Sequence, residues 1–162
     1  MSLLPATADL YDAHGEKLQV LAPIFRNFGG VLDFAGPVVT LKVYEDNSLV
    51  RTTLEESGAG RVLVVDGGGS MRCALVGDNL AEIGHKNGWS GIVVYGCIRD
   101  CAPIAAIAIG VKAIATNPRK SVKKGEGERD VILRFAEVVI RPGDYLYADI
   151  DGVVVADKKL HR

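Results

Sequence analysis

Hydrophobic residues in the middle of the chain form short continuous runs, and these runs alternate with a segment of helical periodicity. Residues 61–66 and 91–95 are two such runs, and strands that are buried on both faces of a sheet have this composition. Between them, residues 78–87 place Leu80 and Ile83 on one helical face and charged residues on the opposite face. This alternation predicts an α/β domain with parallel strands at its centre.

The same patterns predict further elements in the first two thirds of the chain. Thr7, Asn47 and Asp78 are the expected N-caps of three helices, because their side-chain oxygens can accept hydrogen bonds from the free amides of a first helical turn. Glu45 and Asp46 precede Asn47 and could cap the same helix. The additional elements are helices at residues 7–15 and 47–57 and strands at residues 37–44 and 111–115.

The last third of the chain has a different pattern. Residues 131–140, 145–148 and 153–156 are rich in β-branched and aromatic residues. Turn residues separate them, at 142–144 and at 151–152. We expect this β-rich part to be antiparallel or barrel-like and to lie against the α/β core.

Composition and charge narrow the possible classes of protein. The chain has 162 residues, which fits one domain over residues 1–162. Its 19 Lys and Arg residues and 20 Asp and Glu residues argue against direct nucleic-acid binding and against an anionic membrane surface. The nearly uncharged apolar run at residues 101–111 is too short to span a bilayer, and residues 1–5 lack the features of a secretion signal. Three cysteines form no framework, so reduced thiols and a cytoplasmic location are expected.

A basic segment interrupts the hydrophobic pattern at residues 119–127. It contains four Lys and Arg residues and two glycines, and we expect an exposed loop. Two interpretations remain open for it. It is either a solvated charged loop or a contact for an acidic ligand or partner.

Two short motifs carry candidate chemistry, and each follows or precedes a predicted element of the core. Arg99 and Asp100 follow the strand at 91–95, and Gly77, Asp78, Asn79 and Leu80 open the helix at 78–87. In open α/β sheets, ligands bind at the carboxyl ends of the strands.

The residue types in these motifs suit a small oxo-acid. A helix N-terminus offers free amides to a carboxylate, and Arg99 can bind a carboxylate in a bidentate way. Asp100 can ligate a hard divalent cation whose other ligands are water and substrate oxygens. The alternatives stay open at this point: Arg99 and Asp100 as a surface ion pair, and Asp78 as a helix cap only.

The chain resembles the family that contains the regulator of ribonuclease E activity A and the class II 4-hydroxy-4-methyl-2-oxoglutarate aldolases. The similar stretches cover nearly the whole chain, and the spacing of Asp78 from Arg99 and Asp100 matches the family motif. This resemblance implies a swivelling β/β/α-type domain in a homotrimeric ring, with sites at subunit interfaces. The similar stretches are EDNSLV (45–50), VLVVDGGGSMRCALVGDNLAE (62–82), NGWSGIVVYGCIRD (87–100) and GDYLYADIDGVVV (143–155).

The resemblance also implies a reaction and roles for the motif residues. The backbone of Gly77, Asp78, Asn79 and Leu80 and the side chain of Arg99 would bind a small 2-oxo acid. Asp100 would bind Mg²⁺ or Mn²⁺, and Arg99 and Asp100 would be the catalytic pair. The implied reaction is retro-aldol cleavage of 4-hydroxy-4-methyl-2-oxoglutarate to two pyruvates, with oxaloacetate decarboxylation as a side activity. A metal fits this chemistry, since it stabilises the enolate that both reactions form.

One residue departs from the aldolase pattern. Pro103 stands where aldolases of this family tend to carry an acidic residue, three positions after Asp100.

Two other functions are alternatives to the lyase activity. The first alternative is a non-catalytic regulator that binds and inhibits ribonuclease E. The second is a methyltransferase, because residues 62–69 superficially resemble a loop that binds S-adenosylmethionine. The strand at 91–95 has no acidic residue at its end, where such a loop would need one for the ribose, which argues against the second.

Overall fold

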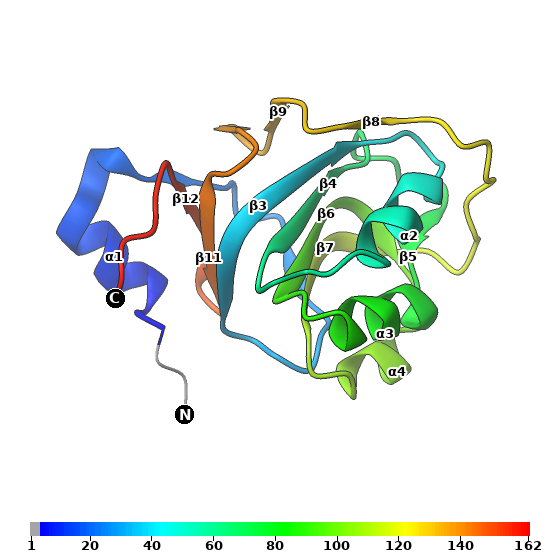
Figure 1. The fold of residues 1–162 in the computed structure, drawn as a ribbon, viewed down its shortest axis with the longest axis horizontal. Helices are drawn as coiled ribbons and strands as arrows, with labels where there is room; N and C mark the ends of the chain where they lie inside the picture. Colours follow the sequence, from blue (N-terminus) through cyan, green and yellow to red (C-terminus); the bar gives the residue numbers. More distant parts are fainter. Residues whose placement is uncertain (1–3) are drawn as a thin grey trace.

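The backbone is organised around a mixed β-sheet in the order β1-β12-β11-β3-β4-β6-β7-β2, to which β5 and β8 are added through β6 and β3 (Figure 1). The structure is a computed structural model that describes residues 4–162. The strands are β1 (Gln19–Val20), β2 (Arg26–Asn27), β3 (Phe34–Lys42), β4 (Val62–Asp66), β5 (Ala74–Val76), β6 (Gly91–Ile98), β7 (Gly110–Thr116), β8 (Glu128–Arg129), β9 (Leu133–Phe135), β10 (Val138–Ile140), β11 (Tyr145–Asp149) and β12 (Gly152–Ala156). The helices are α1 (Thr7–His14), the 3-10 turn η1 (Gly15–Lys17), α2 (Ser48–Leu54), α3 (Asp78–Lys86) and α4 (Cys101–Ala105).

The centre of the sheet is parallel, as the sequence predicts. Strands β3, β4, β6 and β7 pair in parallel, and β4 is buried along its whole length. Helices α2, α3 and α4 cover one face of these strands (Figure 1). Leu41, Leu63, Ile92 and Leu80 belong to the hydrophobic core between this face and the helices.

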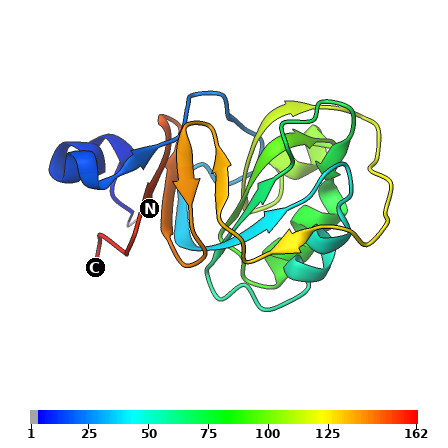
Figure 2. The same ribbon diagram turned by 90° about the horizontal axis from the view of Figure 1, so that it is seen from above.

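Strand β3 joins the parallel half of the sheet to the antiparallel half. Its first residues, from Phe34 to Pro37, pair antiparallel with β11, and its later residues, from Val38 to Lys42, pair parallel with β4. The β-rich C-terminal part therefore continues the same sheet through β11 and β12. The sheet is curled, and the separate β9–β10 hairpin packs over the face opposite the helices (Figure 2).

Several predicted boundaries differ from the structure. The β-rich stretch 131–140 is not one strand, because Ala136 and Glu137 have φ of 48° and 67° and form the turn between β9 and β10. Two consecutive residues with positive φ fit the right-handed twist of a two-residue hairpin. Strand β6 extends three residues beyond the predicted end, to Ile98. Helix α4 falls inside the apolar run for which no helix is predicted.

The expected cap of the first helix is wrong. Thr7 is the first residue of α1, Ala6 occupies the cap position, and no side chain caps this helix end. Instead, the Thr7 amide and hydroxyl donate to the Asp149 carboxylate at 2.8 and 2.7 Å. A contact across the fold has replaced the local cap and ties α1 to the β11–β12 hairpin.

Two sequence expectations about thiols and membranes can be compared with the structure. The cysteines are all free, with Cys73 and Cys97 buried and Cys101 exposed. Burial raises the pKa of the Cys73 and Cys97 thiols, which favours their protonated form. Within residues 4–162, no helix is both long and apolar enough to cross a membrane.

Candidate functional site

The pairing of β5 with β6 brings the two sequence motifs together. Val76, the last residue of β5, is the register partner of Ile98, the last residue of β6. The two strands are parallel, so the next residues, Gly77 and Arg99, leave the sheet side by side. The Arg99 amide donates to the Val76 carbonyl at 2.9 Å. The two motifs are far apart in the sequence, but they lie side by side in the fold because β5 and β6 end next to each other.

Asp100 has an unusual backbone conformation that turns its carboxylate towards α3. It has φ 62° and ψ 45°, in the left-handed region, which aspartate tolerates better than most residues. Its Oδ2 accepts a hydrogen bond from the Asp78 amide at 3.1 Å. Asp78 is therefore not the cap of α3: Gly77 holds the cap position, and Asp100 supplies the missing acceptor from another element.

Gly77 is required by this arrangement. A Cβ at this position would lie 2.7 Å from Asp100 Oδ2 and 3.5 Å from Arg99 Nε. Because the shorter distance is below any normal Cβ contact, a side chain here would displace the Asp100 carboxylate. The glycine lets the two functional side chains pass directly over the start of α3.

These residues line one shallow hollow, which we call the small hollow. It has a volume of about 90 Å³ and is lined by all six residues that the sequence singles out, Gly77 to Leu80 with Arg99 and Asp100. Leu80 is buried in the core at 5% exposure, so it can offer a ligand its backbone only. Arg99 is half-buried, and its Nη1 donates to the Pro118 carbonyl at 3.3 Å.

Besides Asn47, four further polar residues line the small hollow, and the sequence analysis assigns none of these five to the site. Arg51 comes from α2, and Lys120, Ser121 and Lys123 come from the basic loop, residues 119–127. The positive charge of the loop is visible in the sequence. Its position beside Asp100 is not, because it depends on contacts between distant segments.

Residues 45–48 hold the basic loop in place. Asp46 is 2% exposed. Its Oδ1 accepts the Ser48 amide at 2.9 Å, and its Oδ2 accepts the Lys124 and Glu126 amides at 2.8 and 3.1 Å. Burial works against the charged form, but these hydrogen bonds outweigh it and lower the pKa of Asp46 from 3.8 to about 2. Asp46 thus caps α2, as one of the sequence hypotheses states, and it also fastens the loop.

Asn47 also holds the basic loop in place. It occupies the cap position of α2, but its side chain makes no cap hydrogen bond, so the prediction of Asn47 as the capping side chain is wrong. Its Nδ2 donates to the Leu75 carbonyl at 3.1 Å, and its Oδ1 accepts the Ser121 hydroxyl at 2.8 Å. The side chain therefore connects β5 to the basic loop across the back of the small hollow.

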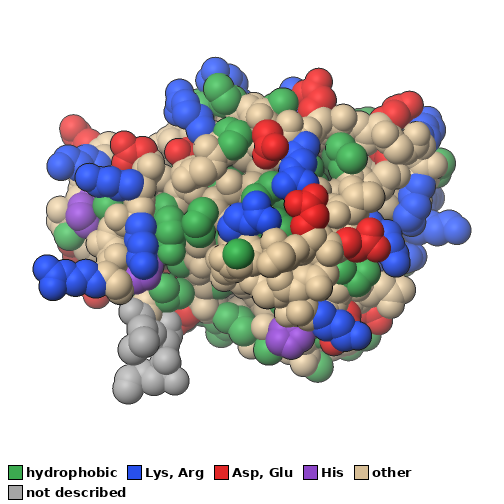
Figure 3. All heavy atoms as spheres, in the orientation of Figure 1, with side chains coloured by type: hydrophobic (Ala, Val, Ile, Leu, Met, Phe, Trp, Pro, Cys, Tyr) green, Lys and Arg blue, Asp and Glu red, His purple; other side chains and the backbone are tan. Residues whose placement is uncertain are grey.

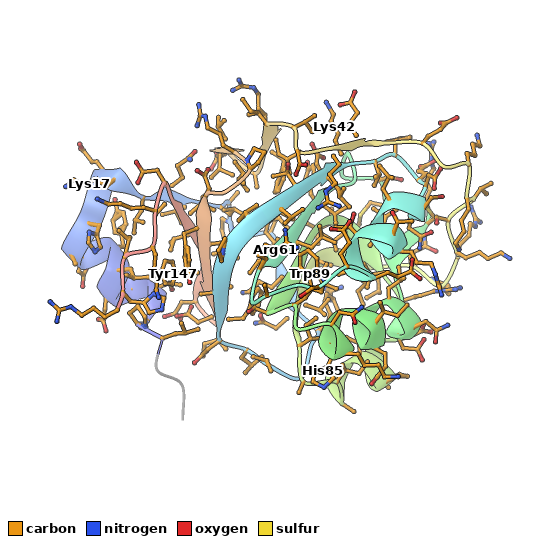
Figure 4. The ribbon with its side chains drawn as sticks, viewed as in Figure 1. Lys17, Lys42, Arg61, His85, Trp89 and Tyr147 are labelled. Atoms are coloured by element: carbon orange, nitrogen blue, oxygen red, sulfur yellow. The ribbon has the colours of Figure 1, made fainter. Side chains whose placement is uncertain are left out.

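Two other side chains, those of Trp89 and His85, lie outside the small hollow. Trp89 is buried, donates from Nε1 to the Glu56 carbonyl at 3.1 Å and carries the Arg61 guanidinium 4.9 Å from its ring centroid (Figure 4). His85 is exposed on α3 (Figure 4). Trp89 therefore packs in the core, and His85 is solvated.

The glycine-rich turn after β4 is filled by the protein itself. A Cβ on Gly68 would lie 2.9 Å from the Tyr44 ring, and a Cβ on Gly69 would lie 3.0 Å from the Tyr95 ring. Both glycines have positive φ, of 68° and 69°. The turn thus uses glycine for its backbone conformation and for contact with two tyrosines.

The fold and the small hollow define a mixed α/β protein with a curled sheet, whose candidate site lies where parallel strands β5 and β6 end. The chain belongs to the RraA-like family, because the model of that family, described as Aldolase/RraA, matches residues 7–155. A protein of Alkalilimnicola ehrlichii named "Putative 4-hydroxy-4-methyl-2-oxoglutarate aldolase" is 62% identical over 154 residues, which are 95% of this chain and 96% of that protein. The family resemblance is therefore confirmed.

Two solved structures have closely similar folds and different names. The RNA-processing inhibitor RraA from Thermus thermophilis is 47% identical, with a TM-score of 0.94 over 98% of this chain and 96% of that one. A protein from Geobacillus kaustophilus HTA426, named as an S-adenosylmethionine: 2-dimethylmenaquinone methyltransferase, is 53% identical, with a TM-score of 0.94 over 96% of this chain and 97% of that one. Names within this family thus span a lyase, an inhibitor and a methyltransferase.

Proposed function

We propose that this protein is a divalent-metal-dependent lyase that cleaves 4-hydroxy-4-methyl-2-oxoglutarate to two molecules of pyruvate. Oxaloacetate decarboxylation would be a secondary activity. The observation that carries the proposal is the convergence of Arg99, the Asp100 carboxylate and the N-terminal amides of α3 on one hollow. The name of the Alkalilimnicola ehrlichii relative supports the same activity.

The first role of the small hollow is to hold the carboxylate of the 2-oxo acid. Amides in the first turn of a helix have no acceptor within the helix. The Asp78 amide is taken by Asp100, so the amides of Asn79 and Leu80 are the ones that can bind the substrate. Arg99 uses one N–H for the Pro118 carbonyl and keeps others for a carboxylate. Two amides and a guanidinium would orient the substrate before bond cleavage.

The donors present fit a hard divalent cation. Asp100 is exposed and uses only Oδ2 for the Asp78 amide, which leaves Oδ1 for a ligand such as Mg²⁺ or Mn²⁺. Residues 4–162 contain no cluster of three His, Cys, Asp or Glu side chains that could hold a metal, so water and substrate oxygens would complete the coordination. A bound cation would supply the positive charge that stabilises the oxygen of the 2-oxo group as the C3–C4 bond breaks.

The departure at Pro103 limits this chemistry. Pro103 lies exposed within α4, so this position supplies no carboxylate to the small hollow. We therefore expect proton transfer to use water and turnover to be slow.

The test is Mg²⁺-dependent pyruvate release, measured with wild type and with Asp100→Asn. Asparagine tolerates the left-handed conformation and can still accept the Asp78 amide, so the fold is kept while the metal ligand is lost. We expect a loss of about 100-fold or more in pyruvate release, since several kcal/mol of charge stabilisation disappear. Asp157→Asn, at an exposed position, is the matched control and should keep wild-type activity. Equal activity of wild type and Asp100→Asn would reject the proposal.

A second candidate function is inhibition of ribonuclease E. The 47% identity to the inhibitor RraA from Thermus thermophilis favours it. A pull-down with purified ribonuclease E, followed by an RNA cleavage assay, tests it directly. The methyltransferase named for the Geobacillus protein gains no support from the geometry, because the glycine turn after β4 is packed against Tyr44 and Tyr95.

We also propose that the protein assembles as a homotrimer. The family resemblance implies this assembly, and exposed apolar side chains such as Tyr11, Val20 and Ile150 offer surface for it. Light scattering coupled to size-exclusion chromatography would give three times the chain mass. A monomeric mass at micromolar concentration would contradict it.

A further inference from the structure

A larger hollow lies next to the small hollow and shares Lys120 with it. We call it the large hollow. Its volume is about 520 Å³, against about 90 Å³ for the small hollow. Sites for small molecules usually measure about 300–1,000 Å³. The small hollow is thus undersized for a complete substrate, whereas the large hollow can take the part that extends beyond it.

The basic loop forms a wall of the large hollow, and its backbone is held at both ends. The Arg119 carbonyl accepts the Ala74 amide at 2.7 Å. The Lys124 amide donates to Asp46 Oδ2 at 2.8 Å. Arg119, Lys120 and Lys124 therefore project from a fixed backbone rather than from a free loop.

Two of the three acidic residues around the large hollow are already committed. Glu45 accepts Arg72 Nε at 2.6 Å, and the hydrogen bond from Arg72 lowers the pKa of the Glu45 carboxyl. Both oxygens of Asp46 accept hydrogen bonds from the backbone. Neither carboxylate forms an ion pair with a cation of the basic loop.

The cations of the loop have no such partners. No ion pair in the described part of the chain joins Arg119, Lys120 or Lys124 to a carboxylate. Glu126 is the one uncommitted carboxylate in the lining, so positive charge remains in excess. Figure 3 shows Lys and Arg side chains along the edge of the molecule where the basic loop runs in Figure 1.

We propose that the large hollow binds a second carboxylate of the substrate through Arg119 and Lys124. The inference rests on the proposed function: the 2-oxo acid end would lie at Arg99 and Asp100, and the rest of the molecule would pass Lys120 into the large hollow. The protein would then select 2-oxo acids that carry a carboxylate beyond C4, over short monocarboxylates such as pyruvate.

The experiment compares binding of two ligands that cannot undergo the cleavage. Pyruvate has one carboxylate and reaches only the small hollow. 2-Oxoglutarate has two carboxylates and lacks the 4-hydroxyl group that retro-aldol cleavage needs. Isothermal titration calorimetry in the presence of Mg²⁺ gives the Kd of each ligand for wild type, Arg119→Gln, Lys124→Gln and the control Lys158→Gln, which alters an exposed lysine outside both hollows.

We expect Arg119→Gln and Lys124→Gln to weaken 2-oxoglutarate binding about two- to fivefold, as for loss of a solvent-accessible charge pair. Pyruvate binding should stay unchanged in both variants, and the control should match wild type for both ligands. Equal weakening of both ligands, or no weakening of 2-oxoglutarate, would overturn the inference. Normal cleavage of the long substrate with unchanged 2-oxoglutarate binding would overturn the inference but keep the lyase. Selective 2-oxoglutarate binding without any pyruvate release would keep the inference and reject the lyase.

Discussion

Replacing Asp46 by asparagine removes the negative charge that holds the basic loop in place, while the size of the side chain stays nearly the same. In wild type, Oδ1 accepts the amide and hydroxyl of Ser48, and Oδ2 accepts the amides of Lys124 and Glu126. Asparagine has one side-chain oxygen, so it can accept hydrogen bonds either from Ser48 or from the amides of Lys124 and Glu126, but not from both. Whichever way the amide group is turned, its NH₂ faces at least one backbone N–H. We therefore expect one side of the fastening to be lost.

The size of the effect follows from the pKa. Lowering the pKa of Asp46 from 3.8 to about 2 corresponds to roughly 2 kcal/mol of stability at neutral pH. Since the folded-state pKa is the lower one, this contribution is complete above about pH 4 and is lost as the pH falls towards 2. We expect Asp46→Asn to lower the free energy of unfolding by about 2 kcal/mol at pH 7, with a smaller difference from wild type at pH 3.

Urea unfolding at equal protein concentration, followed by circular dichroism at pH 7 and pH 3, measures this difference. Asp157→Asn is the matched control, because Asp157 is exposed and a substitution there should change stability by less than about 0.5 kcal/mol. A variant as stable as wild type at pH 7, or a deficit that does not shrink in acid, would refute the assignment of Asp46 as a charged anchor.

Two further predictions concern single residues. Gly77→Ala places a Cβ 2.7 Å from Asp100 Oδ2, so we expect at least a tenfold loss of pyruvate release with unchanged far-ultraviolet circular dichroism; full activity would show that the contact can relax. Lys112 is 2% exposed and donates to the Asp149 carbonyl at 2.6 Å, and burial lowers its pKa. Because the unfolded chain then binds the extra proton, wild type should gain stability relative to Lys112→Met as the pH rises towards 10.5 in urea titrations. A difference that does not change with pH would contradict a buried amine that is unfavourable in its charged form.

The parallel centre of the fold was predictable because its strands are hydrophobic along their whole length. Residues 61–66 and 91–95 form almost continuous apolar runs, which predict strands buried on both faces of the sheet. The helix at 78–87 has a clear apolar side. The two-residue strands β1, β2 and β8 carry no such pattern. They exist because longer neighbours offer them free edges, which a local pattern does not show.

The candidate site was predictable in its residues and not in its contacts. Aspartate is a common N-cap residue, so the sequence predicts Asp78 as the cap of α3. Only the fold reveals that the side chain of Asp100, 22 residues away, accepts the hydrogen bond at this helix end. The left-handed conformation of Asp100 is likewise set by the turn between β6 and α4. The basic loop is evident in the sequence, but its fastening to Asp46 joins segments 78 residues apart.

Residues 46 and 47 connect the two hollows, because they form hydrogen bonds both to β5 and to the basic loop. Asn47 bonds the Leu75 carbonyl in β5, immediately before the site, and accepts from Ser121 in the basic loop. Asp46 holds the other end of the loop at Lys124. The distance between Asp100 and the loop cations is therefore set by residues 46 and 47 rather than by a free chain. Loosening this segment should weaken binding of a dicarboxylate, which under the proposal spans both hollows, more than binding of pyruvate, which would use only Arg99, Asp100 and the start of α3.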